Sequence, residues 1–78
     1  MIETEVKSAR GRCDLVLHLK DTRYVMELKV GDTAQNALKQ INSKGYAIPY
    51  QTPDKKIVKI GISFSRETRT IEDWIIEQ

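Results

Sequence analysis

Two acids and one lysine interrupt two neighbouring apolar segments of the chain. Asp14 lies within residues 12–20, and Glu27 and Lys29 lie two positions apart within residues 23–30. Because side chains alternate across a strand, Glu27 and Lys29 share one face. Charges in such apolar segments are costly unless they are paired or bind a ligand. These three residues are therefore the first candidates for chemistry.

A hairpin would bring the acids together. The polar residues 21–22 separate the two segments, and closure through this pair sets Asp14 opposite Lys29 and Val16 opposite Glu27. Asp14 and Glu27 are then diagonal neighbours, roughly 7–8 Å apart at the backbone, which one metal ion can bridge. A slip of one residue would turn Asp14 to the other face, among leucines.

This pattern suits Mg²⁺, which prefers oxygen ligands, keeps several waters and also binds substrate phosphate oxygens. We expect Asp14 and Glu27 to bind Mg²⁺ or Mn²⁺, with the backbone carbonyl of Leu28 as a further oxygen ligand. Lys29 can orient or deprotonate an attacking water and offset charge in the transition state, while the metal acts as a Lewis acid. The residues predict metal-dependent hydrolysis of a phosphodiester.

The elements that must position these residues follow the order β-β-β-α-β-β. Alternating apolar residues predict five strands, at residues 2–8, 12–20, 23–30, 57–64 and 70–77, the last at a sheet edge. A 3.6-residue stripe predicts one helix at about 34–44, which should pack on the sheet. Asp32 or Thr33 caps its start, Gln35 follows Asp32 as in a capping box, and Gly45 ends it. The strand-helix-strand order implies one parallel pairing in an otherwise antiparallel sheet.

The two hairpin strands have unlike faces. The face opposite the acids is apolar and carries Cys13, Leu15, Leu17, Leu19, Tyr24, Met26, Leu28 and Val30. The predicted fold is an α/β domain with a mixed sheet of four to five strands and one main helix.

Composition limits the classes of protein and of functional site that fit this chain. With 78 residues, 40% hydrophobic and 31% charged, the chain suits a single globular domain over residues 1–78 and lacks an apolar run long enough for a membrane span. One cysteine and one histidine exclude an internal disulfide and a Cys/His zinc site. We expect a soluble, cytoplasmic protein. The net charge of +2 is too small to predict nucleic-acid binding by itself.

The motifs resemble a known family. Gly-Arg-Cys-Asp-Leu-Val-Leu at 11–17, followed by Val-Met-Glu-Leu-Lys at 25–29, is similar to the D…ExK signature of PD-(D/E)XK phosphodiesterases. The segments Ala-Leu-Lys-Gln-Ile, Lys-Gly-Tyr-Ala, Pro-Tyr and Ile-Gly-Ile-Ser-Phe-Ser, which follow, resemble a bacterial branch found C-terminal to AAA-ATPase-like domains. The resemblance covers the chain from about Glu5 onward. ExK alone is a weak motif, and the other segments make it more specific.

By this resemblance the chain has a restriction-endonuclease-like core. Asp14 and Glu27 would bind metal, Lys29 would be the catalytic lysine, and Gln40 would be an accessory residue near the scissile phosphate. The substrate would be nucleic acid, with DNA favoured over RNA.

One feature departs from the family pattern. The family core normally begins with a helix that packs on the sheet and often adds another acid, whereas this chain starts at its first strand. Glu3 or Glu5 could supply that acid instead. Without the helix, apolar sheet surface stays open. We therefore expect a homodimer, a domain swap, or a place in a larger chain with an ATPase-like domain.

Three functions remain open. The first is a Mg²⁺-dependent nuclease. The second is a catalytically inactive nuclease-fold module that binds nucleic acid or oligomerises within an ATPase system, with Asp14, Glu27 and Lys29 as an inert ion-pair cluster. The third is a protein-binding domain tethered to an ATPase. Metal dependence separates the first from the other two.

Several other residues have two interpretations each. Gln40 and Lys44 form either an exposed helix flank or a substrate contact, with equal weight. For the basic residues at 55, 56, 59, 66 and 69, solvated loops are favoured over phosphate contacts. Tyr46 covers the helix end or stacks on bases, the former being commoner. Trp74 is expected to pack against the core or an oligomer partner.

Overall fold

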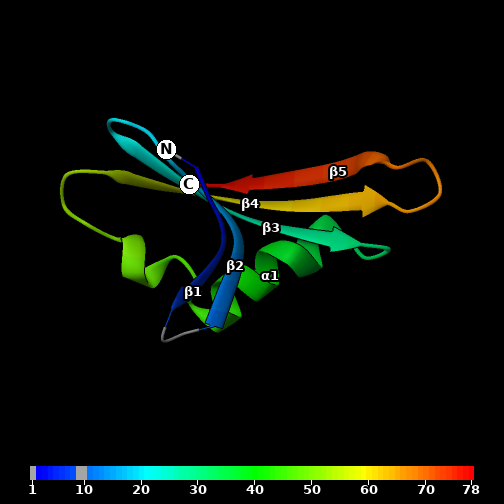
Figure 1. The fold of residues 1–78 in the computed structure, drawn as a ribbon, viewed down its shortest axis with the longest axis horizontal. Helices are drawn as coiled ribbons and strands as arrows, with labels where there is room; N and C mark the ends of the chain where they lie inside the picture. The colour runs from blue at the N-terminus through cyan, green and yellow to red at the C-terminus, as the bar shows by residue number, and fades with distance from the viewer. Residues whose placement is uncertain (1, 9–10) are drawn as a thin grey trace.

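Five strands form one mixed sheet with a single long helix on one face (Figure 1). The computed structural model describes the backbone of residues 2–8 and 11–78 and the side chains from residue 15 onward. The elements are β1 (Ile2–Ser8), β2 (Gly11–His18), β3 (Thr22–Val30), α1 (Ala34–Lys44), the short 3₁₀ helix η1 (Ile48–Tyr50), β4 (Lys56–Ser65) and β5 (Thr70–Glu77).

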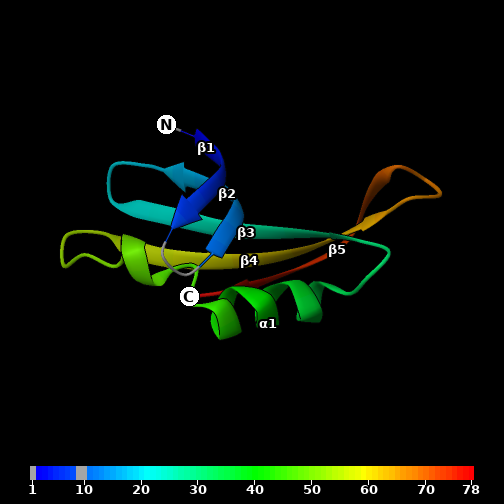
Figure 2. The same cartoon turned by 60° about the horizontal axis from the view of Figure 1, so that its bottom comes forward.

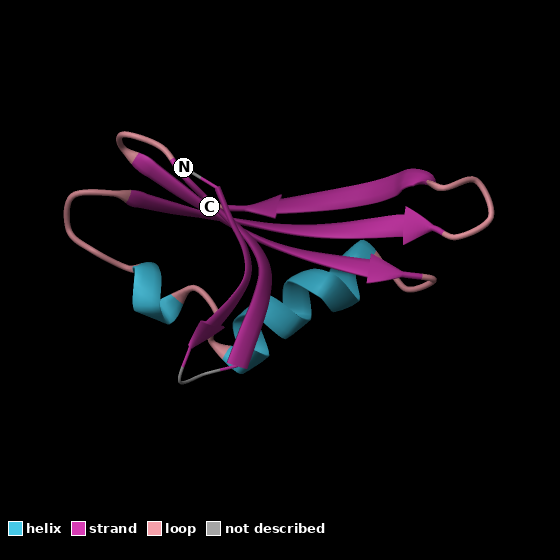
Figure 3. Ribbon diagram, viewed as in Figure 1, coloured by secondary structure: helices cyan, strands magenta, loops and turns pink. Residues whose placement is uncertain are grey.

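The strands lie in the order β1-β2-β3-β4-β5, with β3 and β4 parallel and the other pairs antiparallel. This confirms the predicted α/β fold, its element order and the edge position of β5. β1 and β2 curl out of the plane formed by β3, β4 and β5 (Figures 1 and 3).

Local sequence explains the limits of α1. Thr33 is the N-cap, and its hydroxyl accepts a hydrogen bond from the backbone N–H of Asn36 at 3.0 Å. Gly45 ends the helix in the left-handed conformation, with φ 66°, which glycine adopts at little cost. The capping box predicted for Asp32 and Gln35 is wrong, because Asp32 accepts instead from the backbone N–H of Thr33 and the side-chain amide of Asn36, both at 2.7 Å.

The helix covers the face of the sheet that carries the predicted acids. Its stripe of Ala34, Ala37 and Ile41 is buried. Gly61 on β4, which pairs with Glu27, allows the close approach: a Cβ there would lie 2.6 Å from the backbone nitrogen of Leu38. Figure 2 shows α1 lying along this face.

The core lies between β2, β3, α1 and the segment after the helix. The buried cluster consists of Val16, Val25, Ile41, Tyr46 and Ala47. Val16 and Val25 are paired across β2 and β3, and neither is exposed to solvent. The core therefore sits directly beside the predicted site.

The predicted register of the β2–β3 hairpin is wrong by two residues. His18 pairs with Arg23 and Val16 with Val25, so the turn lies at residues 20–21 and not at 21–22. The physical reason is a contact distant in sequence: Thr22 already belongs to the parallel ladder, opposite Lys56 of β4. A shift of two residues keeps every side chain on its predicted face.

The other face of the sheet is apolar and open. It exposes several large side chains, Leu28, Val30, Ile71, Trp74 and Ile76. Trp74 is 59% exposed, so its expected packing on the core is wrong, and its packing against an oligomer partner stays a prediction. The predicted open apolar surface is confirmed for the described residues. In that same part of the chain, no helix is long and apolar enough to cross a membrane.

Candidate metal and phosphate site

Glu27 occupies the middle of β3 and points toward α1. It is only 5% exposed. The side-chain amide of Gln40 donates a hydrogen bond to its Oε2 at 2.9 Å and lies 3.2 Å from the hydroxyl oxygen of Tyr46. A buried carboxylate is costly without hydrogen bonds or a nearby cation, so this placement requires compensation. The interpretation of Gln40 as part of an exposed helix flank is therefore wrong, because its side chain contacts Glu27 and Tyr46.

Lys29 lies on the same face as Glu27, two residues further along β3, and is partly exposed. It lines an open depression of about 310 Å³ at the side of α1. The other lining residues are Asp32, Asn36, Lys39, Gln40, Ser43 and Lys44. Gln40 belongs to both the depression and the Glu27 contact, so the two are continuous.

Asp14 lies in β2, but its side chain falls outside the described residues. The pairing of β2 with β3 runs from Leu15 with Met26 to His18 with Arg23, so Asp14 directly precedes the first paired residue of β2. This register is two residues away from the one that would pair Asp14 with Lys29, so that predicted pairing is wrong.

The other predicted metal ligands have no described side-chain contact to a metal site. Glu3 and Glu5 lie in β1, and their side chains are outside the described residues. Leu28 turns its side chain to the open face, and the role of its carbonyl oxygen stays a prediction. Among the side chains that are described, no three His, Cys, Asp or Glu residues gather as a metal-binding group.

Asp32 is an acidic residue of the depression and lies at its end near the start of α1. The hydrogen bond from the Asn36 side chain, followed by that from the backbone N–H of Thr33, holds the pKa of Asp32 below its usual value. The charge of Lys29 lowers this pKa further. Asp32 therefore stays ionised at neutral pH and repels anions from the N-terminal end of α1.

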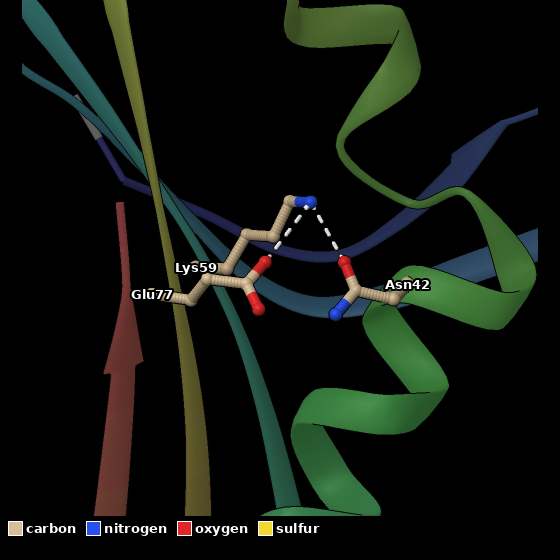
Figure 4. A network of polar contacts seen from close by, with 3 residues as sticks. All are labelled: Asn42, Lys59 and Glu77. Atoms are coloured by element: carbon tan, nitrogen blue, oxygen red, sulfur yellow. Dashed lines mark hydrogen bonds and ion pairs between the residues drawn. The ribbon is translucent and has the colours of Figure 1, made fainter.

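The basic residues of β4 do not form one surface. Lys59 donates to Oδ1 of Asn42 at 2.7 Å and forms an ion pair with Glu77 at 3.4 Å (Figure 4). It thus joins β4 to α1 and β5. Residues 55–56 and 66–69 lie at opposite ends of the ten-residue strand, about 30 Å apart. This separation favours the solvated-loop interpretation.

The sequence interpretation missed two parts of the site. The Tyr46 hydroxyl lies beside the Gln40 amide, which neither interpretation of Tyr46 included. Lys39 lines the depression beside Gln40. The sequence feature that could have identified this surface is the spacing of Asn36, Gln40 and Ser43. It places these polar side chains in one stripe beside the apolar stripe of the helix.

The fold and this arrangement define a class. A mixed sheet with an acid and a lysine two residues apart, on the strand that enters the parallel crossover and beside a helix glutamine, is the arrangement of restriction-endonuclease-like domains. Residues 1–74 match the PD-(D/E)XK nuclease superfamily, and the chain belongs to that superfamily.

The chain is also similar to a longer protein. It is 31% identical over 78 residues to an uncharacterized protein in the vnfD 5' region of Azotobacter chroococcum mcd 1. The match covers 97% of this chain and 15% of that protein, so the chain spans about one seventh of the relative's length. A search of the solved structures gives no match.

Proposed function

We propose that this chain is a Mg²⁺- or Mn²⁺-dependent nuclease domain that hydrolyses phosphodiester bonds of nucleic acid, with DNA favoured over RNA. The observation that carries the proposal is the buried Glu27, hydrogen-bonded by Gln40 and followed by Lys29 at the edge of a basic depression. Membership of the PD-(D/E)XK nuclease superfamily supports the same function.

The donor chemistry fits a hard divalent cation. Glu27 offers carboxylate oxygens, and a second acid, Asp14, lies on the neighbouring strand β2 next to Leu15, which pairs with Met26. Mg²⁺ is commonly held by one or two carboxylates, with waters and substrate phosphate oxygens completing its shell. Asp14, Glu27 and the carbonyl oxygen of Leu28 would hold the ion. When bound, it supplies a Lewis acid and an activated water.

Gln40 and Lys29 would orient the metal-binding carboxylate and bind the substrate phosphate. The amide of Gln40 holds the Glu27 carboxylate in one orientation. The ammonium group of Lys29, on the same face, can donate to the scissile phosphate and offset its charge as the bond breaks. Gln40 also reaches the depression, where it can contact the phosphate.

The domain is proposed to act in the cytoplasm as part of a larger assembly. The open apolar face supports a homodimer, and the much longer relative supports a chain that includes another domain. An ATPase-like domain is the proposed neighbour, by the sequence resemblance given above.

The test is cleavage of labelled DNA and RNA, linear and branched, with Mg²⁺, Mn²⁺ or EDTA. Glu27→Gln keeps the size of the side chain and removes its charge, and Lys29→Gln removes the cation. Both should lower the rate at least about 100-fold, as loss of an electrostatic catalytic group does. Glu72→Gln, on exposed β5, is the charge-matched control and should cut normally.

Metal binding gives a second measurement. A ligand that binds only the folded state stabilises it, by about 2.7 kcal/mol at 100 times its Kd. Mn²⁺ should therefore raise the unfolding midpoint of the wild type and not that of Glu27→Gln. A folded wild type that neither cuts nucleic acid nor is stabilised by Mn²⁺ would favour the inactive module.

A further inference from the structure

The depression beside α1 has the composition of an anion site. Among the side chains from residue 15 onward, its lining holds three lysines, Lys29, Lys39 and Lys44, against one acid, Asp32. That is a local excess of two positive charges, as large as the net charge of the whole chain. Within the part of the chain whose side chains are described, none of the three lysines forms an ion pair.

Most of the residues that line the depression also lie along one side of the helix. Asn36, Lys39, Gln40, Ser43 and Lys44 follow the i, i+3, i+4, i+7, i+8 spacing of one helix side. They cover about 12 Å of helix length at 1.5 Å per residue. Hydroxyl and amide groups thus stand between the lysines, where they can donate hydrogen bonds to phosphate oxygens.

Charge fixes which end of the depression an anion prefers. Asp32 lies at the start of α1 and stays ionised, because Asn36 and Thr33 donate hydrogen bonds to it. At the other end, with Lys39 and Lys44, the described side chains of the lining include no acid. Lys44 also offsets the negative end of the helix, so part of its charge has a structural role.

We propose that Lys39 and Lys44 bind a backbone phosphate of the nucleic acid next to the scissile phosphate, which would lie at Lys29 and the metal ion that Glu27 would hold. This inference rests on the proposed nuclease function and extends it by giving the path of the strand: from the acids, past Gln40, along the outer side of α1. The two lysines bind and align the substrate and take no part in the chemistry.

The test is binding measured by fluorescence anisotropy in EDTA, so that cleavage does not interfere. The variant is Lys39→Gln with Lys44→Gln. The matched control is Lys20→Gln with Lys56→Gln, which removes the same charge from exposed positions. Lys56 pairs with Thr22, seven residues from Lys29 on β3, so this control lies about 23 Å away along the strand.

We expect the Lys39/Lys44 variant to bind labelled DNA about tenfold more weakly than the control. The slope of log K against log salt, measured between about 50 and 200 mM, should fall by about 0.9, because the two lysines neutralise one phosphate. Circular dichroism should show equal unfolding midpoints. Equal affinity and equal slope for the two double variants would overturn the inference.

The inference and the proposed function can fail separately. If the wild type cuts with Mg²⁺ but the Lys39/Lys44 variant binds as tightly as the control, the depression is not the strand path and the nuclease stands. If that variant loses binding while the wild type never cuts, the depression is supported and the nuclease is overturned. Inorganic phosphate that competes with DNA only through Lys39 and Lys44 would support the same site.

Discussion

Gly61 controls the distance between α1 and the sheet, and its replacement by alanine tests whether that distance holds the site together. A Cβ at this position would lie 2.6 Å from the backbone nitrogen of Leu38 and closer still to the carbonyl oxygen of Ala34. Ordinary contact between such atoms needs about 3.5 Å, so the helix must move by roughly 1 Å. Since both neighbours are backbone atoms, no side chain can rotate to make room.

Overpacking of this kind costs about 1–3 kcal/mol, and contact with backbone favours the upper end. The whole domain is expected to have a free energy of unfolding on the order of 4–12 kcal/mol. Gly61→Ala should thus lower the urea midpoint by about 2–3 M, given a slope near 1 kcal/mol per M. It should also move Gln40 away from Glu27, which are 2.9 Å apart in the hydrogen bond.

Gly31→Ala is the control. Gly31 has φ 68°, and nothing lies within 4 Å of the added carbon. Its replacement should cost only the strain of the left-handed conformation, about 1–2 kcal/mol. Urea unfolding followed by circular dichroism compares the two. If Gly61→Ala unfolds at the same urea concentration as Gly31→Ala or above it, the close approach of α1 does not limit the packing here.

Two further predictions concern the start of α1 and the open face. The hydrogen bond from Asn36 holds the pKa of Asp32 below its usual 3.8, so its stabilising effect is complete above about pH 4 and is lost as the pH falls through the lowered value. Asp32→Asn should flatten the acid dependence of the urea midpoint, and an unchanged dependence would contradict this. Leu28 and Trp74 are 41% and 59% exposed on the apolar face, so Leu28→Lys with Trp74→Lys should convert a dimer into monomers in sedimentation equilibrium. A wild type that sediments as a monomer at high concentration would refute the homodimer.

The sequence was sufficient to predict the elements because each has a clear local signal. Alternating apolar residues marked the strands, and the stripe of Ala34, Ala37 and Ile41 marked the helix. Thr33 and Gly45 are residue types that commonly cap helices, so the first and last residues of α1 could be predicted from them. The parallel pairing of β3 and β4 followed from the element order alone.

The register of the hairpin and the distance between α1 and the sheet depend on contacts distant in sequence. Thr22 joins the ladder with Lys56, 34 positions later, and this contact moves the hairpin turn. The distance between α1 and β4 depends on Gly61, whose role appears only once the helix is packed on β4. The contact between Gln40 and Glu27 could therefore be expected only by family resemblance.

The burial of Glu27 bears on the choice between the active and inactive interpretations. In the inactive module, Asp14, Glu27 and Lys29 form an ion-pair cluster that was predicted from Asp14 facing Lys29, whereas the paired residues of β2 and β3, from Leu15 with Met26 to His18 with Arg23, follow a register two residues away from that one. A buried carboxylate is costly unless hydrogen bonds or a cation compensate its charge, and Glu27 is only 5% exposed. The amide of Gln40 is neutral and donates to only one oxygen of Glu27. A divalent ion beside Glu27 would compensate this charge, so the burial of Glu27 supports the proposed metal binding.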